Sequence, residues 1–385
     1  METVLFAMVA AMLTVYVVLD GFDFGVGILH RLVARTDDER RTVLAAIGPV
    51  WDGNEVWLVA AAGVLFMGFP RVYSAAFSGF YLALMIVLWM LIVRGIAIES
   101  RSRQENPLWR EFWDTAFSLS SALLAVVLGA SLGNMVRGMP LDSTGFFAIP
   151  LFTDFRAGMQ PGIFDWYTTL VGVFSLCVLA GHGALYLVWK TTGPVQVRSA
   201  AWARRIWLAV LPLWVLVTLA TAWIQPEIYK NLLARPWSLG FVLLMLGGLC
   251  GVFRFALWRG LETTPQRETT PQRETTPQRE TTPQRETTPQ RETTPQRELM
   301  AFLSSSSFIL SLLATTMTGR YPIWLRSTLD PAHSLTAANT VVQSYALQVG
   351  LVWLSIGMAL AGGYFVYLFR SVRGKVGSDA AEHGY

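Results

Sequence analysis

Long uninterrupted apolar runs constrain this 385-residue chain more than any other feature of its sequence. A helix needs about 20 predominantly apolar residues to cross the hydrocarbon core of a bilayer. Nine windows of that kind occur, at about 5–29, 43–68, 75–98, 115–136, 163–189, 203–224, 237–258, 299–318 and 344–369. A β-barrel would instead alternate apolar and polar residues over roughly ten-residue segments. Only 15% of the residues are charged, so the sequence predicts an all-α polytopic membrane protein with about nine transmembrane helices.

The distribution of Lys and Arg between these windows predicts the orientation, because cytoplasmic loops are enriched in basic residues. The loops after the first, third and fifth windows and the C-terminal tail are basic, whereas the loop after the second window carries only Arg71. The basic residues concerned are Arg31, Arg35, Arg40, Arg41, Arg101, Arg103, Arg110, Lys190, Arg198, Arg204, Arg205, Arg370, Arg373 and Lys375. We therefore expect the N-terminus outside and the C-terminus in the cytoplasm. No basic residue precedes the first window, which favours a retained span over a signal peptide.

Four carboxylates lie inside the first two windows, and each is costly in the middle of a bilayer. Asp20 and Asp23 fall in the last third of the first window, whereas Asp52 and Glu55 fall two to three turns into the second. Arg94 lies near the inner end of the third window, where it could compensate a neighbouring carboxylate. At 1.5 Å per residue all five groups fall in the inner half of the membrane, so we expect one polar cluster.

A path for protons through a membrane needs carboxylates, hydroxyls and water at short intervals. Asp52, Asn54 and Glu55 could supply the inlet of such a path. The alternative for Asp20 and Asp23 is structural: each could simply hydrogen-bond to a nearby helix end or to an arginine. Both interpretations stay open at this point.

The histidines and cysteines give little support for a cofactor site. Only His182 of the four histidines lies within a window, and a core histidine bonded between helices is its expected state. Cys177 and Cys250 fall in apolar runs and are expected to be buried, unpaired thiols. Gly21 and Gly25 have the small-xxx-small spacing that lets a neighbouring helix approach closely. We find no metal-ligand cluster, phosphate-binding loop or nucleophile–base pair, so catalysis by this chain alone is not expected.

A low-complexity insertion separates the seventh and eighth windows. The hexad Glu-Thr-Thr-Pro-Gln-Arg occurs six times in tandem from Glu262 to Arg297. Each unit is neutral and polar and contains a proline, so it cannot bury enough apolar surface to offset the entropy of ordering. The expected organisation is therefore helices one to seven in 1–261, a disordered cytoplasmic insertion in 262–298, and helices eight and nine with a cytoplasmic tail in 299–385.

Several motifs together identify a family. Asp20-Gly-Phe-Asp-Phe-Gly-Val-Gly27, Trp51-Asp-Gly-Asn-Glu-Val-Trp57 and Ala76-Phe-Ser-Gly-Phe-Tyr81 resemble subunit II of the cytochrome bd-type quinol oxidases. Gly181-His-Gly-Ala-Leu-Tyr186 and Ser334-Leu-Thr-Ala-Ala-Asn-Thr340 extend the resemblance toward the C-terminus. It covers essentially the whole chain except the hexad insertion.

The resemblance implies a bacterial inner-membrane heterodimer in which a partner, subunit I, carries b-type and d-type haems and oxidises quinol. Such a complex reduces O2 to water with cytoplasmic protons. The family pattern makes Asp52 a carboxylate of the proton path, with Trp51 and Arg94 close by. We expect two four-helix bundles plus one peripheral helix. No haem or metal ligand is expected on this chain, and its other partners would be lipid and small single-span accessory subunits, with no nucleic acid.

Two other classes of function remain as alternatives. A secondary transporter could use the same carboxylates to bind a coupling ion or a proton, although transporters often contain inverted repeats and none is evident here. In a membrane scaffold, the polar residues would only fix the packing of the helices. A haem-bearing partner that co-purifies with the chain would distinguish an oxidase subunit from both.

Overall fold

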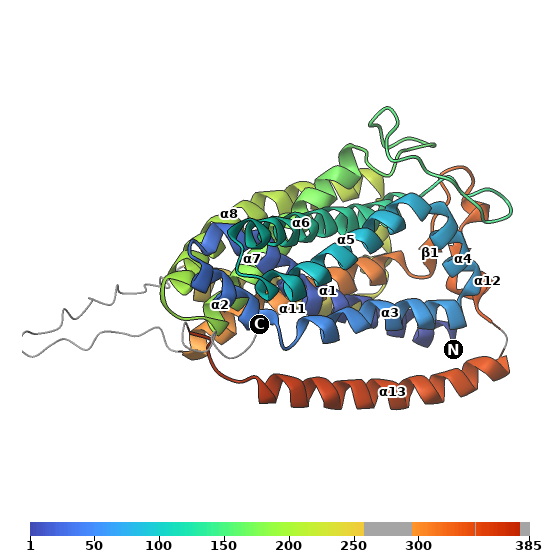
Figure 1. The fold of residues 1–385 in the computed structure, drawn as a ribbon. Coiled ribbons are helices and arrows are strands. Elements are labelled where there is room, and N and C mark those ends of the chain that lie inside the picture. The colour runs from blue at the N-terminus through green and yellow to red at the C-terminus, as the bar shows by residue number, and fades with distance from the viewer. Residues whose placement is uncertain (258–294, 343, 378–385) are drawn as a thin grey trace, which may run out of the picture.

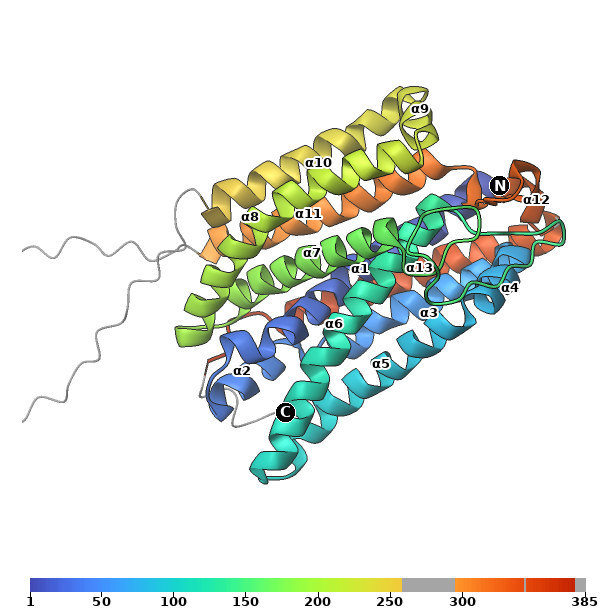
Figure 2. The same ribbon diagram turned by 90° about the horizontal axis from the view of Figure 1, so that it is seen from above.

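The computed structural model describes residues 1–257, 295–342 and 344–377, which form long helices lying side by side (Figures 1 and 2). Within these ranges, eight helices are long and apolar enough to cross a membrane. They are α1 (Glu2–Val33), α5 (Tyr81–Ser100), α6 (Pro107–Arg137), α7 (Trp166–Lys190), α8 (Gly193–Ile224), α10 (Leu239–Val252), α11 (Pro295–Arg320) and α13 (Ser344–Ser371). The adjoining turns η1 (Arg101–Arg103), η2 (Pro236–Ser238) and η3 (Phe253–Leu257) lengthen α5 and α10. The prediction of an all-α polytopic membrane protein is confirmed.

The helices form two groups of four with one helix outside them. Helices α1, α3 (Trp51–Gly68), α5 and α6 form one bundle, and α7, α8, α10 and α11 form the other (Figure 2). Both α1 and α6 pack against α7, so the two bundles share a continuous core. Helix α13 runs along the outside, and 0% of its most apolar stretch is buried (Figure 1). This is the expected arrangement of two bundles and a peripheral helix.

The predicted span 43–68 is wrong as a single helix. The structure divides it into α2 (Asp37–Ile47) and α3, with a break around Pro49. Proline has no backbone N–H to donate and its ring crowds the preceding turn, so the helix is interrupted here and restarts at Trp51, after the non-helical residue Val50. The break moves the polar residues of this segment to the very beginning of α3.

The predicted span 75–98 also differs, because α4 (Pro70–Gly79) ends before α5 begins at Tyr81. Gly79 is the last residue of α4. A Cβ atom on Gly79 would lie 2.2 Å from the ring of Phe147, so no larger residue fits at the point where α4 ends. Short elements lie at the same end of the molecule as α4 (Figure 1). They are α9 (Glu227–Leu233), η4 (Pro331–His333), α12 (Ala337–Thr340) and an antiparallel pair of strands, β1 (Ile323–Leu325) and β2 (Leu335–Thr336).

Glycine contacts hold the two bundles together at their boundary. A Cβ atom on Gly25 of α1 would lie 2.0 Å from the carbonyl oxygen of Leu179 and 2.7 Å from the backbone nitrogen of Gly183. Gly21, one turn earlier, contacts the Leu179 side chain. The close helix approach predicted from the spacing of Gly21 and Gly25 is confirmed, and α7 is the helix that approaches.

Two further expectations have different outcomes. Most of the hexad insertion lies outside the described residues, but its last three residues belong to the first turn of α11, which begins at Pro295. The expectation that both cysteines are buried is wrong, because Cys177 is partly buried and Cys250 is exposed. In a membrane-spanning helix an apolar side chain can face lipid at no cost, so an apolar run does not predict burial.

Candidate functional site

Five polar residues from three helices meet inside the first bundle, and we call them the Arg94 cluster. Asp20 and Asp23 come from α1, Asn54 and Glu55 from α3, and Arg94 from α5. One guanidinium nitrogen of Arg94, Nη2, donates to Asp20 Oδ1 (2.6 Å) and to Glu55 Oε1 (2.8 Å). Asn54 Nδ2 donates to Asp23 Oδ2 (2.7 Å). The structure therefore brings together the arginine and three of the four carboxylates that the sequence placed at one depth, Asp20, Asp23 and Glu55.

The Arg94 cluster is almost completely shielded from solvent. The side chains of Asp20 and Arg94 are fully buried, and Glu55 keeps 26% of its side chain exposed. The ring of Phe24 lies 4.5 Å from the guanidinium carbon and covers one of its faces. Removing one partner from such a buried ion pair leaves an uncompensated charge and costs about 3–5 kcal/mol. Arg94 is thus the cation on which these acids depend.

Several buried polar atoms of this cluster have no hydrogen-bond partner among the described residues. They are Asp20 Oδ2, Asp23 Oδ1, Asn54 Oδ1, and Arg94 Nε and Nη1. Buried polar atoms in proteins are almost always bonded to protein or to ordered water. The Arg94 cluster therefore has the chemistry of a site that holds water between ionisable groups.

Asp52 does not lie where the sequence placed it. It belongs to the first turn of α3, is exposed, and its carboxylate makes no hydrogen bond or ion pair with any described residue. The break at Pro49 is the reason, because it starts the helix at Trp51 instead of two turns earlier. The ring of Trp51 packs against Gly95, next to Arg94. Asp52 therefore lies at the exposed beginning of α3, and Glu55 follows it one turn deeper in the same helix.

A second charged cluster, which the sequence did not reveal, surrounds Asp114 on α6. We call it the Asp114 cluster. The carboxylate, whose side chain is fully buried, accepts from His30 Nε2 (2.6 Å), Arg101 Nε (2.6 Å) and Arg40 Nη1 (2.8 Å). These donors come from α1, the turn η1 and α2, so one carboxylate ties four segments together. Glu111, one turn away on α6, also accepts from Arg40 (2.8 Å).

The Asp114 cluster was missed because α6 begins earlier than its apolar run. The window at 115–136 left Asp114 in a loop, whereas the helix starts at Pro107 and has Asn106 as its N-cap. An Asn followed by Pro is a known helix-start signal. Applied to this segment, it would have placed Asp114 two turns inside a helix.

Acidic side chains in the first turn of α2 extend this network toward the surface. Asp37 accepts from Arg101 (2.7 Å) and Arg110 (2.9 Å). Burial alone would raise the pKa of the Asp37 carboxyl, but these two arginines and Arg41 bring that pKa below its usual range. The Glu39 carboxyl, which pairs with Arg198, likewise has a lowered pKa although burial opposes it. Both acids are therefore charged at neutral pH, and arginines of the same end of the molecule balance their charge.

His182 has the state expected of a core histidine. Its Nδ1 lies 2.7 Å from the Ser305 hydroxyl and its Nε2 lies 3.1 Å from the carbonyl oxygen of Val18. The ring also stacks on Phe302 at 4.9 Å. Both ring nitrogens are therefore occupied by protein groups, and the expectation of a histidine bonded between helices is confirmed.

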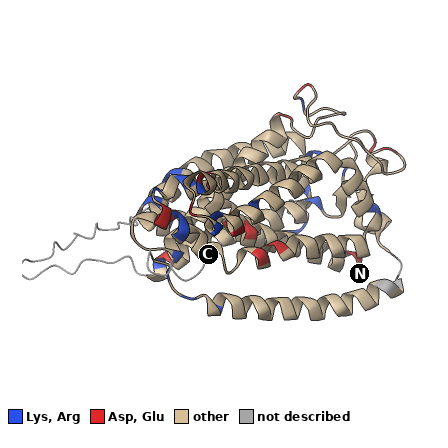
Figure 3. Cartoon of the chain, in the orientation of Figure 1, with Lys and Arg blue, Asp and Glu red and all other residues tan. Residues whose placement is uncertain are grey.

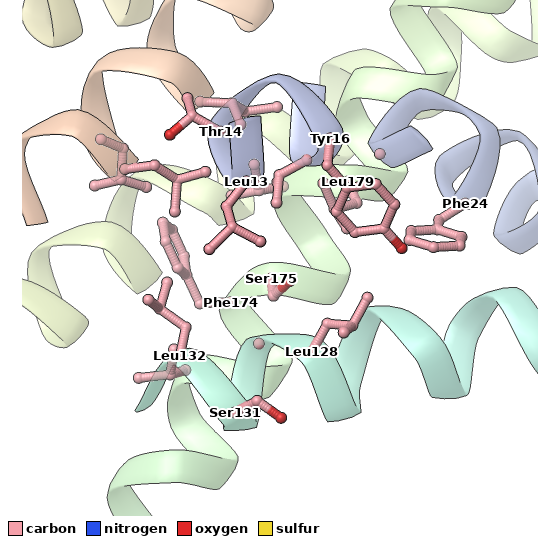
Figure 4. Close-up of a pocket in the computed structure, with 18 of the residues that line it drawn as sticks. Leu13, Thr14, Tyr16, Phe24, Leu128, Ser131, Leu132, Phe174, Ser175 and Leu179 are labelled. Carbon is pink, nitrogen blue, oxygen red and sulfur yellow. The ribbon is translucent and has the colours of Figure 1, made fainter. Parts of the chain in front are cut away.

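An apolar cavity of about 230 Å³ lies next to the Arg94 cluster, between α1, α3, α6, α7 and α11 (Figure 4). Among the hydroxyls in its lining, Thr14 donates to the Ala10 carbonyl and Ser131 to that of Val127, whereas the Tyr16 hydroxyl has no hydrogen-bond partner among the described residues. Tyr16 and Phe24 form one end of the cavity in Figure 4, and Asp20 lies one turn beyond Tyr16 on the same helix. The rest of the lining is apolar.

The charged residues gather toward the end of the molecule that carries α2, while the long middle stretches of the helices are almost uncharged (Figure 3). The Arg94 cluster lies inward from this end, in the first two turns of α3 and the later part of α1. In the described part of the chain no three His, Cys, Asp or Glu side chains are grouped so that they could hold a metal ion. Fold and site together define a multi-pass helical membrane protein with a buried, ion-paired cluster of acids.

Comparison with known proteins gives the family. The model of the cytochrome bd terminal oxidase subunit II family matches residues 1–272, and the chain belongs to this family. It is 37% identical to cytochrome bd-I ubiquinol oxidase subunit 2 of Escherichia coli K12 over 218 residues, which are 57% of this chain and 55% of that protein. It is 34% identical to cytochrome bd ubiquinol oxidase subunit 2 of Bacillus subtilis over 201 residues, 52% of this chain and 57% of that one. The matched stretch thus spans about half the length of these relatives.

The fold is also similar to that of a solved structure. A chain of the bd oxidase from Geobacillus thermodenitrificans superimposes with a TM-score of 0.68 at 17% sequence identity. The alignment covers 96% of this chain and 97% of the other. At that identity the likeness speaks for the fold alone, which it supports over nearly the full length.

Proposed function

We propose that this chain is a subunit of a membrane quinol:O2 oxidoreductase and carries part of the proton path to the site of O2 reduction. The observation that carries the proposal is Arg94, buried between Asp20 and Glu55 with further acids beside it. Such a site can bind and release protons inside a membrane because its arginine compensates the acids as their charge changes. The family supports this role over the transporter alternative.

The haems of such an oxidase belong to the partner subunit in this proposal. In the described part of the chain, both nitrogens of His182 are taken by protein groups and the Nε2 atom of His30 is bonded to Asp114, so neither buried histidine offers its Nε2 atom to a haem iron. A haem iron needs a free axial ligand such as His or Met with room for the macrocycle. The role of this chain is therefore to hold and pass protons, and quinol oxidation and O2 reduction take place on the partner.

The path runs from the surface inward along α3. Asp52 stands at the mouth and Glu55 follows one turn later, in contact with Arg94 and through it with Asp20. Trp51 fixes this turn against Gly95 of α5. Asn54 holds Asp23 beside the same route. These are the residues proposed from the sequence, now in the order in which a proton would meet them.

Glu55 also indicates where the partner packs. It is the partly exposed member of the buried ion pairs, and it opens on a face lined by apolar side chains such as Val56, Val59 and Trp89. A carboxylate facing lipid at this depth would cost on the order of 2.5–3.5 kcal/mol. A protein subunit that covers this face removes that cost and receives the proton from Glu55.

The remaining parts of the proposal concern orientation and organisation. The charged end that carries α2 faces the cytoplasm of a bacterial inner membrane, so the N-terminus is outside and the C-terminus inside, as the basic loops indicate (Figure 3). The hexad insertion joins helices α10 and α11 on the cytoplasmic side. Lipid covers the faces that the partner leaves free, and small single-span subunits are further candidates.

The proposal is tested by purifying the complex through an affinity tag on this chain and recording its absorption spectrum and O2 uptake with quinol. We expect a second, haem-bearing polypeptide in the preparation, with haem bands and quinol-dependent O2 uptake. A colourless preparation containing only this chain, and transporting protons or ions in vesicles, would contradict the oxidase assignment and support a transporter.

A further inference from the structure

Four buried polar atoms without a protein partner line the interface between α1 and α6. They are Asp23 Oδ1 and His30 Nδ1 on α1, and Ser118 Oγ and Ser121 Oγ on α6, and none has a hydrogen-bond partner in the described part of the chain. The two helices pack against each other along this stretch (Figure 2). Asp23 belongs to the Arg94 cluster and His30 to the Asp114 cluster, so the four atoms connect the two charged sites.

Two contacts fix how α1 and α6 meet along this stretch. At one end His30 Nε2 is bonded to Asp114 of α6. About one turn earlier on α1, toward Asp23, a Cβ atom on Gly27 would lie only 2.1 Å from the Ser121 hydroxyl oxygen. Since the two helices run antiparallel, the hydroxyl of Ser118, between Asp114 and Ser121 on α6, lies on the same interface.

The distances suit a chain of hydrogen bonds. His30 follows Asp23 by seven residues, which is two helical turns and about 10 Å along the axis. Buried polar atoms without a protein partner are rare, and ordered water is their usual partner. Two hydroxyls and a few waters cover about 10 Å at ordinary hydrogen-bond lengths of about 2.8 Å.

We propose that His30, Asp114, Ser118 and Ser121 form a second proton inlet, which reaches the Arg94 cluster at Asp23 and bypasses Asp52. The inference deepens the proposed function and rests on it. In the resting state His30 is neutral, with Nε2–H donated to the Asp114 carboxylate and Nδ1 free to accept. Nδ1 takes a proton from the one water that contacts it when a proton arrives from the cytoplasmic side, and returns it to that water, which passes a proton on toward Ser121. His30 is then neutral again, and one proton has moved inward.

The surroundings of His30 support this role. The groups that face it are Asp114 from α6, Arg101 from η1, Arg40 from α2 and the ring of Phe117 at 5.4 Å. Asp114 balances the imidazolium that forms during transfer, while the two arginines keep the carboxylate in place when the histidine is neutral. The same arrangement of a carboxylate behind a histidine orients and stabilises the proton-carrying ring in other proteins.

Two parallel inlets make a specific prediction for a double-mutant cycle in the assembled oxidase. Closing either inlet alone, with Asp52→Asn or with His30→Gln, should slow quinol-dependent O2 uptake only about two- to threefold, because the other inlet still supplies protons. Closing both should slow it at least about tenfold more than the product of the single effects. His30→Gln keeps a side-chain donor for Asp114, so assembly and haem spectrum should stay normal.

Variants of α6 separate proton transfer from packing. In the Asp52→Asn background, Ser121→Ala should lower quinol-dependent O2 uptake as much as His30→Gln does. It should also raise the solvent isotope effect on turnover. Ser120→Ala is the matched control, because the neighbouring buried Ser120 hydroxyl donates to the Phe117 carbonyl within its own helix. A double variant whose rate equals the product of the singles, with Ser121→Ala behaving like Ser120→Ala, overturns the second inlet alone. A wild-type complex with no quinol-dependent O2 uptake contradicts the proposed function itself.

Discussion

Arg94 is the residue on which the charge balance of the interior depends. A single guanidinium nitrogen, Nη2, donates hydrogen bonds to both Asp20 and Glu55, and the ring of Phe24 covers one face of the guanidinium group. Two of its other nitrogens have no partner among the described residues. The side chain therefore combines a structural task, holding α1, α3 and α5 together, with spare donors for water or for a transferred proton.

Replacing Arg94 should show how much of its role is charge. Arg94→Gln leaves Asp20 and Glu55 without a cation, a loss of about 3–5 kcal/mol for a buried pair, so little assembled complex is expected. Arg94→Lys restores a point charge without the planar fork and should recover part of the assembly. The measurement is the yield and melting temperature of the haem-containing complex. Equal, wild-type values for both variants would place Arg94 outside the site described here.

The residues of the two clusters differ in how well the sequence predicts them. Asp20, Glu55 and Arg94 could be predicted together, because charges inside apolar windows are rare and their depth can be counted along each helix. Asp114 and His30 could not, since both sit at the edges of their windows, where an apolar count assigns a loop. Only the side-chain contacts of the folded chain show that they pair.

At the scale of the helices, apolar windows predict where a span lies but not where it breaks. The sequence predicted nine spans, whereas the described residues contain eight helices long and apolar enough to cross a membrane, and two of the predicted spans are divided by a break. Pro49 divides one of them and thereby exposes Asp52, which the uninterrupted window had placed deeper. Missing the break in this helix therefore also meant placing Asp52 too deep in the membrane.

The glycine contact between α1 and α7 gives a prediction with an internal control. Gly25→Ala adds a Cβ atom 2.0 Å from the Leu179 carbonyl oxygen, so the helices must separate and the bundles lose packing. The same substitution at Gly63 of α3 meets nothing within 4 Å. We expect Gly25→Ala to lower the melting temperature and yield of the complex markedly, and Gly63→Ala to leave both unchanged. Similar behaviour of the two variants would show that this contact does not hold the bundles together.

At the scale of the whole molecule, the Arg94 cluster and the Asp114 cluster both lie toward the end that carries α2 (Figure 3). The Arg94 cluster belongs entirely to the first bundle, and the second bundle supports it through α7. We propose that the hexad insertion between α10 and α11 is a passive connection, because it lies far in sequence from every residue of either cluster. The sequence could not predict what covers the partly exposed side chain of Glu55, the place where we propose that a partner chain packs.

In our proposal protons reach the partner subunit through the Arg94 cluster, and both inlets converge on Glu55. Replacing Glu55 therefore tests the proposal most directly. Glu55→Gln keeps the shape and a hydrogen-bonding oxygen for Arg94 but removes the titratable group. We predict at least about a tenfold loss of quinol-dependent O2 uptake in a complex whose haem spectrum is normal. Glu99→Gln, at an exposed acid on α5, is the matched control and should retain full turnover. Full turnover of an assembled Glu55→Gln complex would contradict the account.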